Sequence, residues 1–162
     1  MPGYTRNEIM TALFNKVANS DSLLDPTQRF KTKVRGWKSW TQGNRDVEWP
    51  AIYMVEGKQE YTPDSGRLGH PPIRTFFVDF WIYVDTKNQN NPASFPGGPA
   101  AATAPYLDAI DTVLAPTLGL GLGVNNLGGL VSSCWIDGEV INIPGYNDGL
   151  GLLVVPVKIV GP

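Results

Sequence analysis

The single histidine and the single cysteine, His70 and Cys134, are the residues of this sequence best suited to nucleophilic catalysis. Such catalysis needs a nucleophile held beside a positioned base. His70 lies between Gly69 and Pro71 in a polar stretch, whereas Cys134 lies inside a predicted strand, where a thiol is typically a small core side chain. We therefore predict no catalytic residue, and an enzyme is the least favoured class.

Three carboxylates, Asp79, Asp137 and Glu139, fall in predicted strands and are the candidates for a glycosidase-type acid pair. Acids on a sheet face are more often solvated or paired with cations, and that interpretation is favoured here. Asp108 and Asp111 lie three residues apart on the solvated side of a predicted helix. The sequence shows no cluster with the spacing of metal ligands, so we predict neither a metal nor a cofactor.

Two stretches resemble sites for phosphate groups. Residues 119–123 read GLGLG, but they lack the preceding strand, the following helix and the Lys-Ser/Thr of a phosphate-binding loop. Residues 29–35 place four cations on one face of a predicted strand, which suits either a strip that follows a nucleic-acid backbone or a solvated edge strand. The edge strand is favoured, and the cations are Arg29, Lys31, Lys33 and Arg35.

The composition favours one soluble domain with long loops. The chain has 162 residues, of which 42% are hydrophobic and 17% charged, with 18 glycines and 14 prolines. A single hydrophobic core and a single domain over residues 1–162 fit this length. A net charge of −2 provides no overall field for nucleic acid or membranes. The N-terminal residues lack the apolar stretch of a signal peptide, and no apolar run is long enough to span a membrane.

The stretch 73–85, IRTFFVDFWIYVD, organises the predicted fold, because it is rich in β-branched and aromatic residues and contains neither Gly nor Pro. Strand side chains alternate between faces. One face is almost entirely apolar and belongs in a core. The other face carries Phe77, Asp79, Trp81 and Tyr83, a mixture of aromatic and acidic groups. This mixture is typical either of a surface contacting another protein or of a sheet partly covered by its own loops, and both interpretations stay open.

The remaining elements follow from periodicity and turn signals. Helices are predicted at 6–19, after a Thr5–Glu8 capping box, and at 105–115. Further strands are predicted at 29–35, 51–56, 130–143 and 152–160, and Pro156 predicts an edge or bulged position for the last. Long loops at 57–72 and 86–104 project from the sheet. The order αβββαββ predicts an α+β fold, a mostly antiparallel or mixed sheet of about five strands with two helices on one face.

The predicted contact surface combines the loop at 57–72 with the aromatic strand faces. A ring of subunits needs two complementary patches on each subunit. The candidate interface residues are Lys58, Glu60, Tyr61, Arg67, Phe77, Trp81, Tyr83, Trp135 and Val155.

In the order and spacing of its motifs, the chain resembles the tail terminator proteins of tailed bacteriophages, the lambda-type minor tail protein family. The resemblance covers most of the chain, although the Pro-rich loop at 91–104 departs from the family pattern. Its elements are RNEIMTAL (6–13), WPAIYMVE (49–56), the aromatic strand around residues 80–83, YLDAIDTVL (106–114), LGGLVSSCWIDGE (127–139) and VVPVKI (154–159).

This resemblance implies a hexameric ring that caps the tail tube, stops its polymerisation and offers a face to the head or neck. The implied partners are further copies of the chain, the tail tube protein and a head-completion protein. The implied location is the head-proximal end of the virion tail, with assembly in the host cytoplasm. Genomic DNA passes the ring without specific binding, so we expect Asp79, Asp137 or Glu139 to approach the lumen. Two alternatives stay open, another neck protein (a head-closure protein or head–tail adaptor) and, more remotely, a nucleic-acid-binding module.

Overall fold

The computed structural model describes residues 4–36, 47–64, 69–86, 99–116, 124–143 and 150–161. The helices are α1 (Arg6–Ala18) and α3 (Ala104–Leu114), and short 3₁₀ helices span Asn19–Leu23, Pro26–Gln28, Pro99–Ala102 and Leu127–Gly129. The strands are β1 (Thr32–Arg35), β2 (Ala51–Thr62), β3 (Ile73–Asp85), β4 (Ser133–Ile136), β5 (Ile141–Ile143) and β6 (Leu150–Val160). The GLGLG run at 119–123 and the central part of the 86–104 loop lie outside these residues.

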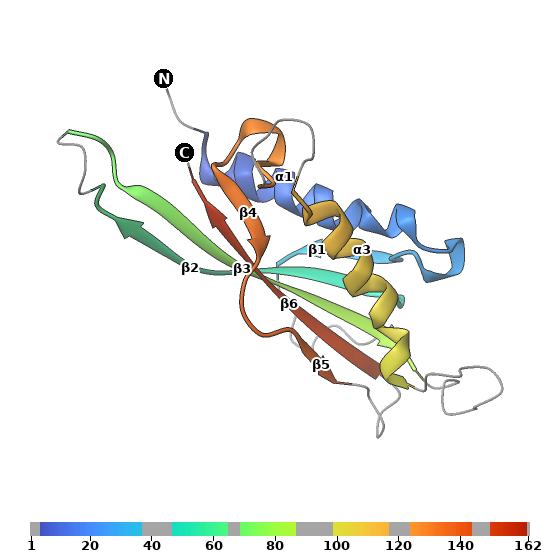
Figure 1. The fold of residues 1–162 in the computed structure, drawn as a ribbon. Helices are drawn as coiled ribbons and strands as arrows, with labels where there is room; N and C mark the ends of the chain where they lie inside the picture. Colours follow the sequence, from blue (N-terminus) through green and yellow to red (C-terminus); the bar gives the residue numbers. More distant parts are fainter. Residues whose placement is uncertain are drawn as a thin grey trace.

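The strands form one mixed six-stranded sheet in the order β1-β2-β3-β6-β4, with β5 also paired to β6. Only β1 runs parallel to its neighbour; every other pairing is antiparallel. Figure 1 shows α1 and α3 together on one side of this sheet. The predicted α+β architecture with two helices on one face is confirmed, with six strands where about five were expected.

The core lies between the helices and the side of the sheet that they cover, which we call the inner face. Thr5 caps α1 as predicted: its side chain accepts from the Glu8 N–H, and Glu8 Oε2 accepts from the Thr5 N–H at 2.7 Å. An apolar stripe on each helix then meets alternate residues of β3 and β6. The largest fully buried side chains are Ile9, Met10, Leu13, Ile52, Met54, Phe76, Phe80, Ile82, Tyr106, Ile110, Leu153 and Ile159.

Strand β6 is an interior strand, so of the two predicted positions the edge position is wrong, whereas an irregularity between β4 and β5 does lie opposite Pro156. Strand β6 pairs with β3 along its whole length and with β4 and β5 on its other side. Pro156 is tolerated because its carbonyl accepts from the Asp137 N–H at 3.0 Å, which points this residue toward the break between β4 and β5. The missing N–H of Pro156 faces that break, where no ladder bond is lost.

The predicted strand 130–143 is divided into β4 and β5. Ile136 pairs with Val157 and Ile141 pairs with Val154, so the four residues 137–140 lie opposite two residues of β6. An irregularity of this kind interrupts the ladder while preserving which side chains face the core. Cys134 remains on the inner face, 1% exposed.

Strand β2 continues six residues beyond its predicted end and forms an arm with the start of β3 (Gly57–Thr62 and Ile73–Phe76). The end of this arm extends past β6, whose last pairing with β3 is at Thr75. The first six residues of the loop predicted at 57–72 are therefore strand, and the segment projects as expected (Figure 1). A bulge between Glu56 and Gln59 admits one extra residue. Gly57 fits there because a Cβ at this position would lie 2.8 Å from the Phe77 carbonyl oxygen.

Candidate interaction surface

The side of the sheet that faces away from α1 and α3, which we call the outer face, is the candidate functional surface. Most of its side chains are partly buried, whereas their inner-face neighbours are almost fully buried. The structure brings the four predicted aromatic residues of β3 and β4 together on this face. Its members are Tyr53, Val55, Phe77, Asp79, Trp81, Tyr83, Trp135, Leu152, Val154, Pro156 and Lys158.

Aromatic rings cluster where β2 begins and β3 ends. The Tyr83 ring centroid lies 5.7 Å from that of Trp49 and 5.9 Å from that of Tyr53. Burial raises the pKa of both tyrosine phenols, and for Tyr83 the neighbouring Tyr53 adds to the effect. Both phenols therefore stay protonated and neutral at any physiological pH.

Asp79 lies in the middle of the outer face with apolar neighbours on both sides. It is opposite Val55 of β2 and Pro156 of β6, and Phe77 and Trp81 flank it along β3. Within the described residues it forms no hydrogen bond or ion pair, and desolvation raises the pKa of its carboxyl group. The indole N–H of neighbouring Trp81 is buried and also has no acceptor. One acceptor and one donor on this face therefore have no partner in the part of the chain that the structure describes.

Two lysines contact the rings nearer to the arm. Lys158 Nζ lies 5.5 Å from the Trp135 ring centroid and 5.8 Å from that of Phe77. Lys58 Nζ lies 4.6 Å from the Phe77 centroid. Asp137 accepts from the Trp135 indole N–H at 3.1 Å and lies 4.0 Å from Lys158. Cation–π contacts of this kind hold the lysines flat on the face and leave the rings partly exposed.

The arm supplies the other predicted contact residues. Lys58 and Glu60 form a 2.7 Å ion pair, with 66% and 49% of their side chains exposed. Tyr61 is 62% exposed and accepts a 2.7 Å hydrogen bond from Gln59. Arg67, another predicted contact residue, lies outside the described residues.

The structure contradicts one predicted interface residue. Val155 is fully buried in the core, because β6 is an interior strand and its odd-numbered residues face the helices. Of the predicted lumen residues, Asp79 lies on the outer face, Asp137 lies just beyond β4, and Glu139 is exposed between β4 and β5. Asp79 and Asp137 approach Pro156 from opposite sides, so roughly two strand spacings, about 10 Å, separate their backbones.

The four predicted cations do not share one face. Strand β1 begins at Thr32, so Arg29 and Lys31 precede it and are exposed. Lys33 pairs with Asp21 at 2.9 Å, and Arg35 pairs with Glu56. Among the described strands β1 pairs with β2 alone, so in this part of the chain it has the predicted edge position. The solvated strip is wrong for Lys33 and Arg35, which turn toward acids on the helix side.

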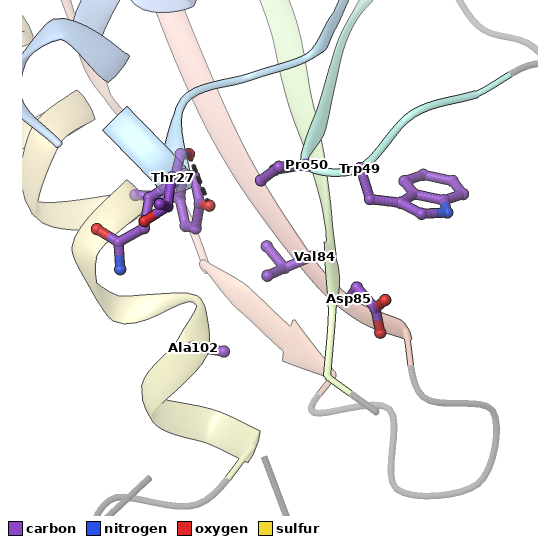
Figure 2. Close-up of a pocket in the computed structure, with 8 residues that line it drawn as sticks. Thr27, Trp49, Pro50, Val84, Asp85 and Ala102 are labelled. Atoms are coloured by element: carbon purple, nitrogen blue, oxygen red, sulfur yellow. Dashed lines mark hydrogen bonds between the residues drawn. The ribbon is translucent and has the colours of Figure 1, made fainter. Parts of the chain in front are cut away.

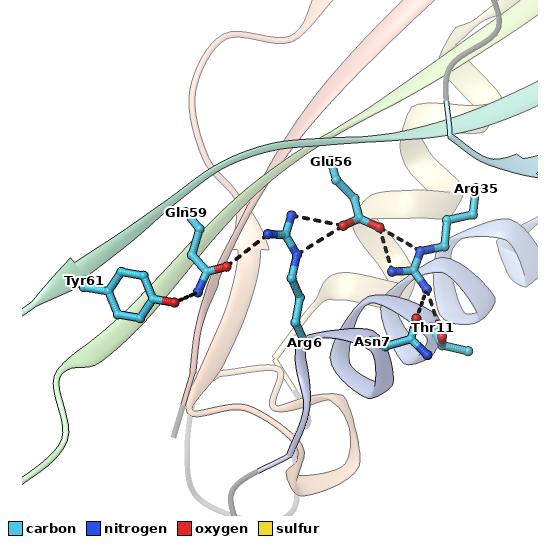
Figure 3. Close-up of polar contacts among 7 residues, drawn as sticks. All are labelled: Arg6, Asn7, Thr11, Arg35, Glu56, Gln59 and Tyr61. Atoms are coloured by element: carbon cyan, nitrogen blue, oxygen red, sulfur yellow. Dashed lines mark hydrogen bonds and ion pairs between the residues drawn. The ribbon is translucent and has the colours of Figure 1, made fainter.

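Sequence reasoning missed an inner-face network centred on Glu56, which Figure 3 shows. Its carboxylate accepts from Arg6 at 3.0 and 3.2 Å and from Arg35 Nε at 2.8 Å. Arg35 also donates to Asn7 at 2.7 Å, and Arg6 donates to Gln59 at 3.1 Å. The bulge in β2 places Gln59 on the same face as Glu56, so the network joins α1, β1 and the arm.

A pocket of about 310 Å³ lies between α3, the start of β2 and the end of β3 (Figure 2). Its walls include Trp49, Pro50, Val84 and Asp85. The hydroxyl of Tyr106, also in the wall, already donates to the Gln28 carbonyl at 2.8 Å. This volume is at the small end of the range for ligand pockets. The outer face, in contrast, carries the Asp79 carboxylate and the Trp81 indole N–H, which have no partners among the described residues.

The geometry gives Cys134 no activation as a nucleophile. Burial raises the pKa of its thiol to about 12, so the reactive thiolate does not form near neutral pH. His70 lies on the segment before β3 and is exposed. Within the described ranges, no three His, Cys, Asp or Glu side chains gather in a way that could hold a metal ion. Among the helices of these ranges, none has the length and apolar character needed to cross a membrane.

No protein-family model and no curated protein sequence matches this chain. The resemblance to tail terminators stays a prediction, carried by the motifs quoted for it.

Proposed function

We propose that this chain is the subunit of a ring that caps a bacteriophage tail tube, ends its polymerisation and offers a surface for head or neck attachment. The observation that carries the proposal is the composition of the outer face. Its partly buried aromatic side chains surround a carboxylate and an indole N–H that have no partners among the described residues. The helices already close the other face of the sheet. A surface of this composition is typical of the centre of a protein–protein interface.

A ring requires that one patch of each subunit meet a different patch of the next. The outer face provides one such patch. The arm provides a second, because its end extends beyond β6 and carries the exposed side chains of Tyr61 and Ile73. The Glu56 network attaches the arm to α1 through Arg6 and Gln59, which orders it before any partner binds. Ordering in advance lowers the entropy lost on association.

The acidic residues have different roles in this proposal. Glu139 is exposed between β4 and β5, so it is the one of the three best suited to a lumen through which DNA passes. Asp137 is occupied by Trp135 and Lys158. Asp79 is partly buried, which suits a protein contact better than an aqueous channel.

The partners in this proposal are further copies of the chain, the tail tube protein and a head-completion protein, and the site of action is the head-proximal end of the virion tail. A nucleic-acid-binding module is less well supported. Lys33 and Arg35 are occupied by acids, and the net charge is −2. Phosphate binding depends on accessible cations in excess.

Negative-stain electron microscopy of the purified protein, with and without tail tubes, tests the proposal. Rings at tube ends, and tubes that no longer elongate when the protein is added, are the expected result. Protein that ignores tubes but binds portal complexes would replace the proposal with a neck adaptor. Protein that binds neither would overturn both interpretations.

A further inference from the structure

Most charged side chains in the described part of the chain find partners inside the subunit, and this makes the exceptions informative. Five ion pairs join cations to acids, all but one between different elements of the fold. Asp79 is different: among the described carboxylates, it alone is partly buried and has no polar partner. The other carboxylates without partners in these ranges are exposed to water, where a lone charge costs little.

Three cations, Lys16, Arg29 and Lys31, also have no hydrogen bond or ion pair within the described ranges, and Lys16 is partly buried on α1. Arg29 and Lys31 precede β1 at the sheet edge, and both are exposed. The backbone between them is firmly held: Phe30 is 7% exposed, its N–H donates to Asp21 at 3.0 Å, and its ring lies 5.4 Å from that of Tyr106. The Lys31 N–H donates to the Pro50 carbonyl at 2.8 Å. The segment therefore presents two cationic side chains from a fixed base.

These two surfaces cannot meet within one subunit. Asp79 lies on β3 at the centre of the outer face, whereas Arg29 lies beyond β1, and β2 separates the two strands. They are complementary in charge and lie on different parts of the surface. A contact between two different patches of identical subunits is heterologous and produces a ring when its rotation closes.

We propose that Asp79 forms an ion pair with the Arg29–Lys31 segment of a second copy of this chain. This inference rests on the ring proposed above and names one contact between its subunits. Arg29 is the better donor, because a planar guanidinium can stack on Phe77 or Trp81 while it donates two hydrogen bonds to the carboxylate. Desolvation of Asp79, which raises the pKa of its carboxyl group in the isolated subunit, is then compensated on assembly.

The test is a charge swap read by sedimentation velocity over a range of protein concentrations. Asp79→Lys alone, and Arg29→Glu with Lys31→Glu, should each weaken self-association on the order of tenfold or more, because each places like charges together. Combining all three substitutions should restore association. Asp108→Lys is the matched control, since Asp108 is an exposed carboxylate on α3 that belongs to neither patch. Circular dichroism confirms that each variant is folded.

A tube-capping assay on the same samples separates this inference from the proposed function. The contact is supported if association is lost in each variant that changes one patch and is regained when all three substitutions are combined. Association unchanged in all variants overturns the contact, while rings at tube ends still support the proposed function. Association that is lost when one patch is changed and is not restored by combining all three substitutions also overturns the contact. A wild-type protein that stays monomeric at every concentration overturns the contact, and tube capping then decides the proposed function by itself.

Discussion

Glu56 and Asp79 lie on neighbouring strands of the same sheet but on opposite faces, and their surroundings are opposite in character. Glu56, on the inner face, is held by two arginines from α1 and β1. Asp79, on the outer face, lies among Val55, Pro156 and aromatic rings, and it forms no ion pair with any described residue. Within the described residues, the carboxylate on the inner face is paired with cations and the carboxylate on the outer face is not.

The largest effect should distinguish two phenylalanines of β3. Phe80 is fully buried against the helices, so Phe80→Ala should lower the free energy of unfolding by about 3–5 kcal/mol. Phe77 is partly exposed on the outer face, so Phe77→Ala should cost about 1 kcal/mol and mainly weaken assembly. Urea denaturation measures both. Equal losses of stability would contradict the difference between the faces.

A smaller effect should distinguish two glutamates of β2. Glu56→Gln removes the charge that two arginines share and should cost about 1–3 kcal/mol of folding stability. Glu60→Gln breaks only an exposed ion pair with Lys58 and should cost less than about 0.5 kcal/mol. Thermal unfolding of both variants at low and moderate salt provides the measurement. If Glu60→Gln is as destabilising as Glu56→Gln, the inner network is not the stabilising one.

The smallest effect should be a gain in stability at Asp79. The pKa of the Asp79 carboxyl group is raised above the ordinary 3.8 in the folded state. The free energy of unfolding therefore falls as the pH rises from about 3.8 through the folded-state pKa, and it is constant above that pKa. Asp79→Asn removes the titrating carboxyl group and with it this loss of folding stability. The monomeric variant should therefore be more stable than wild type by on the order of 0.5 kcal/mol at neutral pH and no more stable below 3.8. Denaturation at several pH values tests this, and a destabilised variant at neutral pH would reveal a cation partner within the subunit.

Local signals were enough to predict much of the fold. The Thr5 and Glu8 pair marked the start of α1, and the alternating residues of β3 correctly divided Phe80 from Phe77. Pairing was harder to predict. Pro156 indicated an edge or bulged strand, and the edge position is wrong. Its missing N–H faces the break between β4 and β5, and this break depends on residues some 20 positions earlier in the chain.

The candidate surface was predicted in part. Period-two alternation placed Trp81, Tyr83 and Trp135 outside the core, but it could not show that β6 is interior, and so it misassigned Val155. The Glu56 network was not predicted because its three charged residues are far apart in sequence and meet only after the bulge and β1 have formed. Contacts between distant elements depend on register, which composition and periodicity do not encode.

Oxidative footprinting of the free and assembled protein tests the central claim, that the outer face is the interaction surface, most directly. The account predicts that Phe77, Trp81 and Trp135 become protected on assembly, whereas Leu23, which is exposed beyond α1, stays reactive. Unchanged reactivity of the three aromatic residues in assembled protein would contradict it.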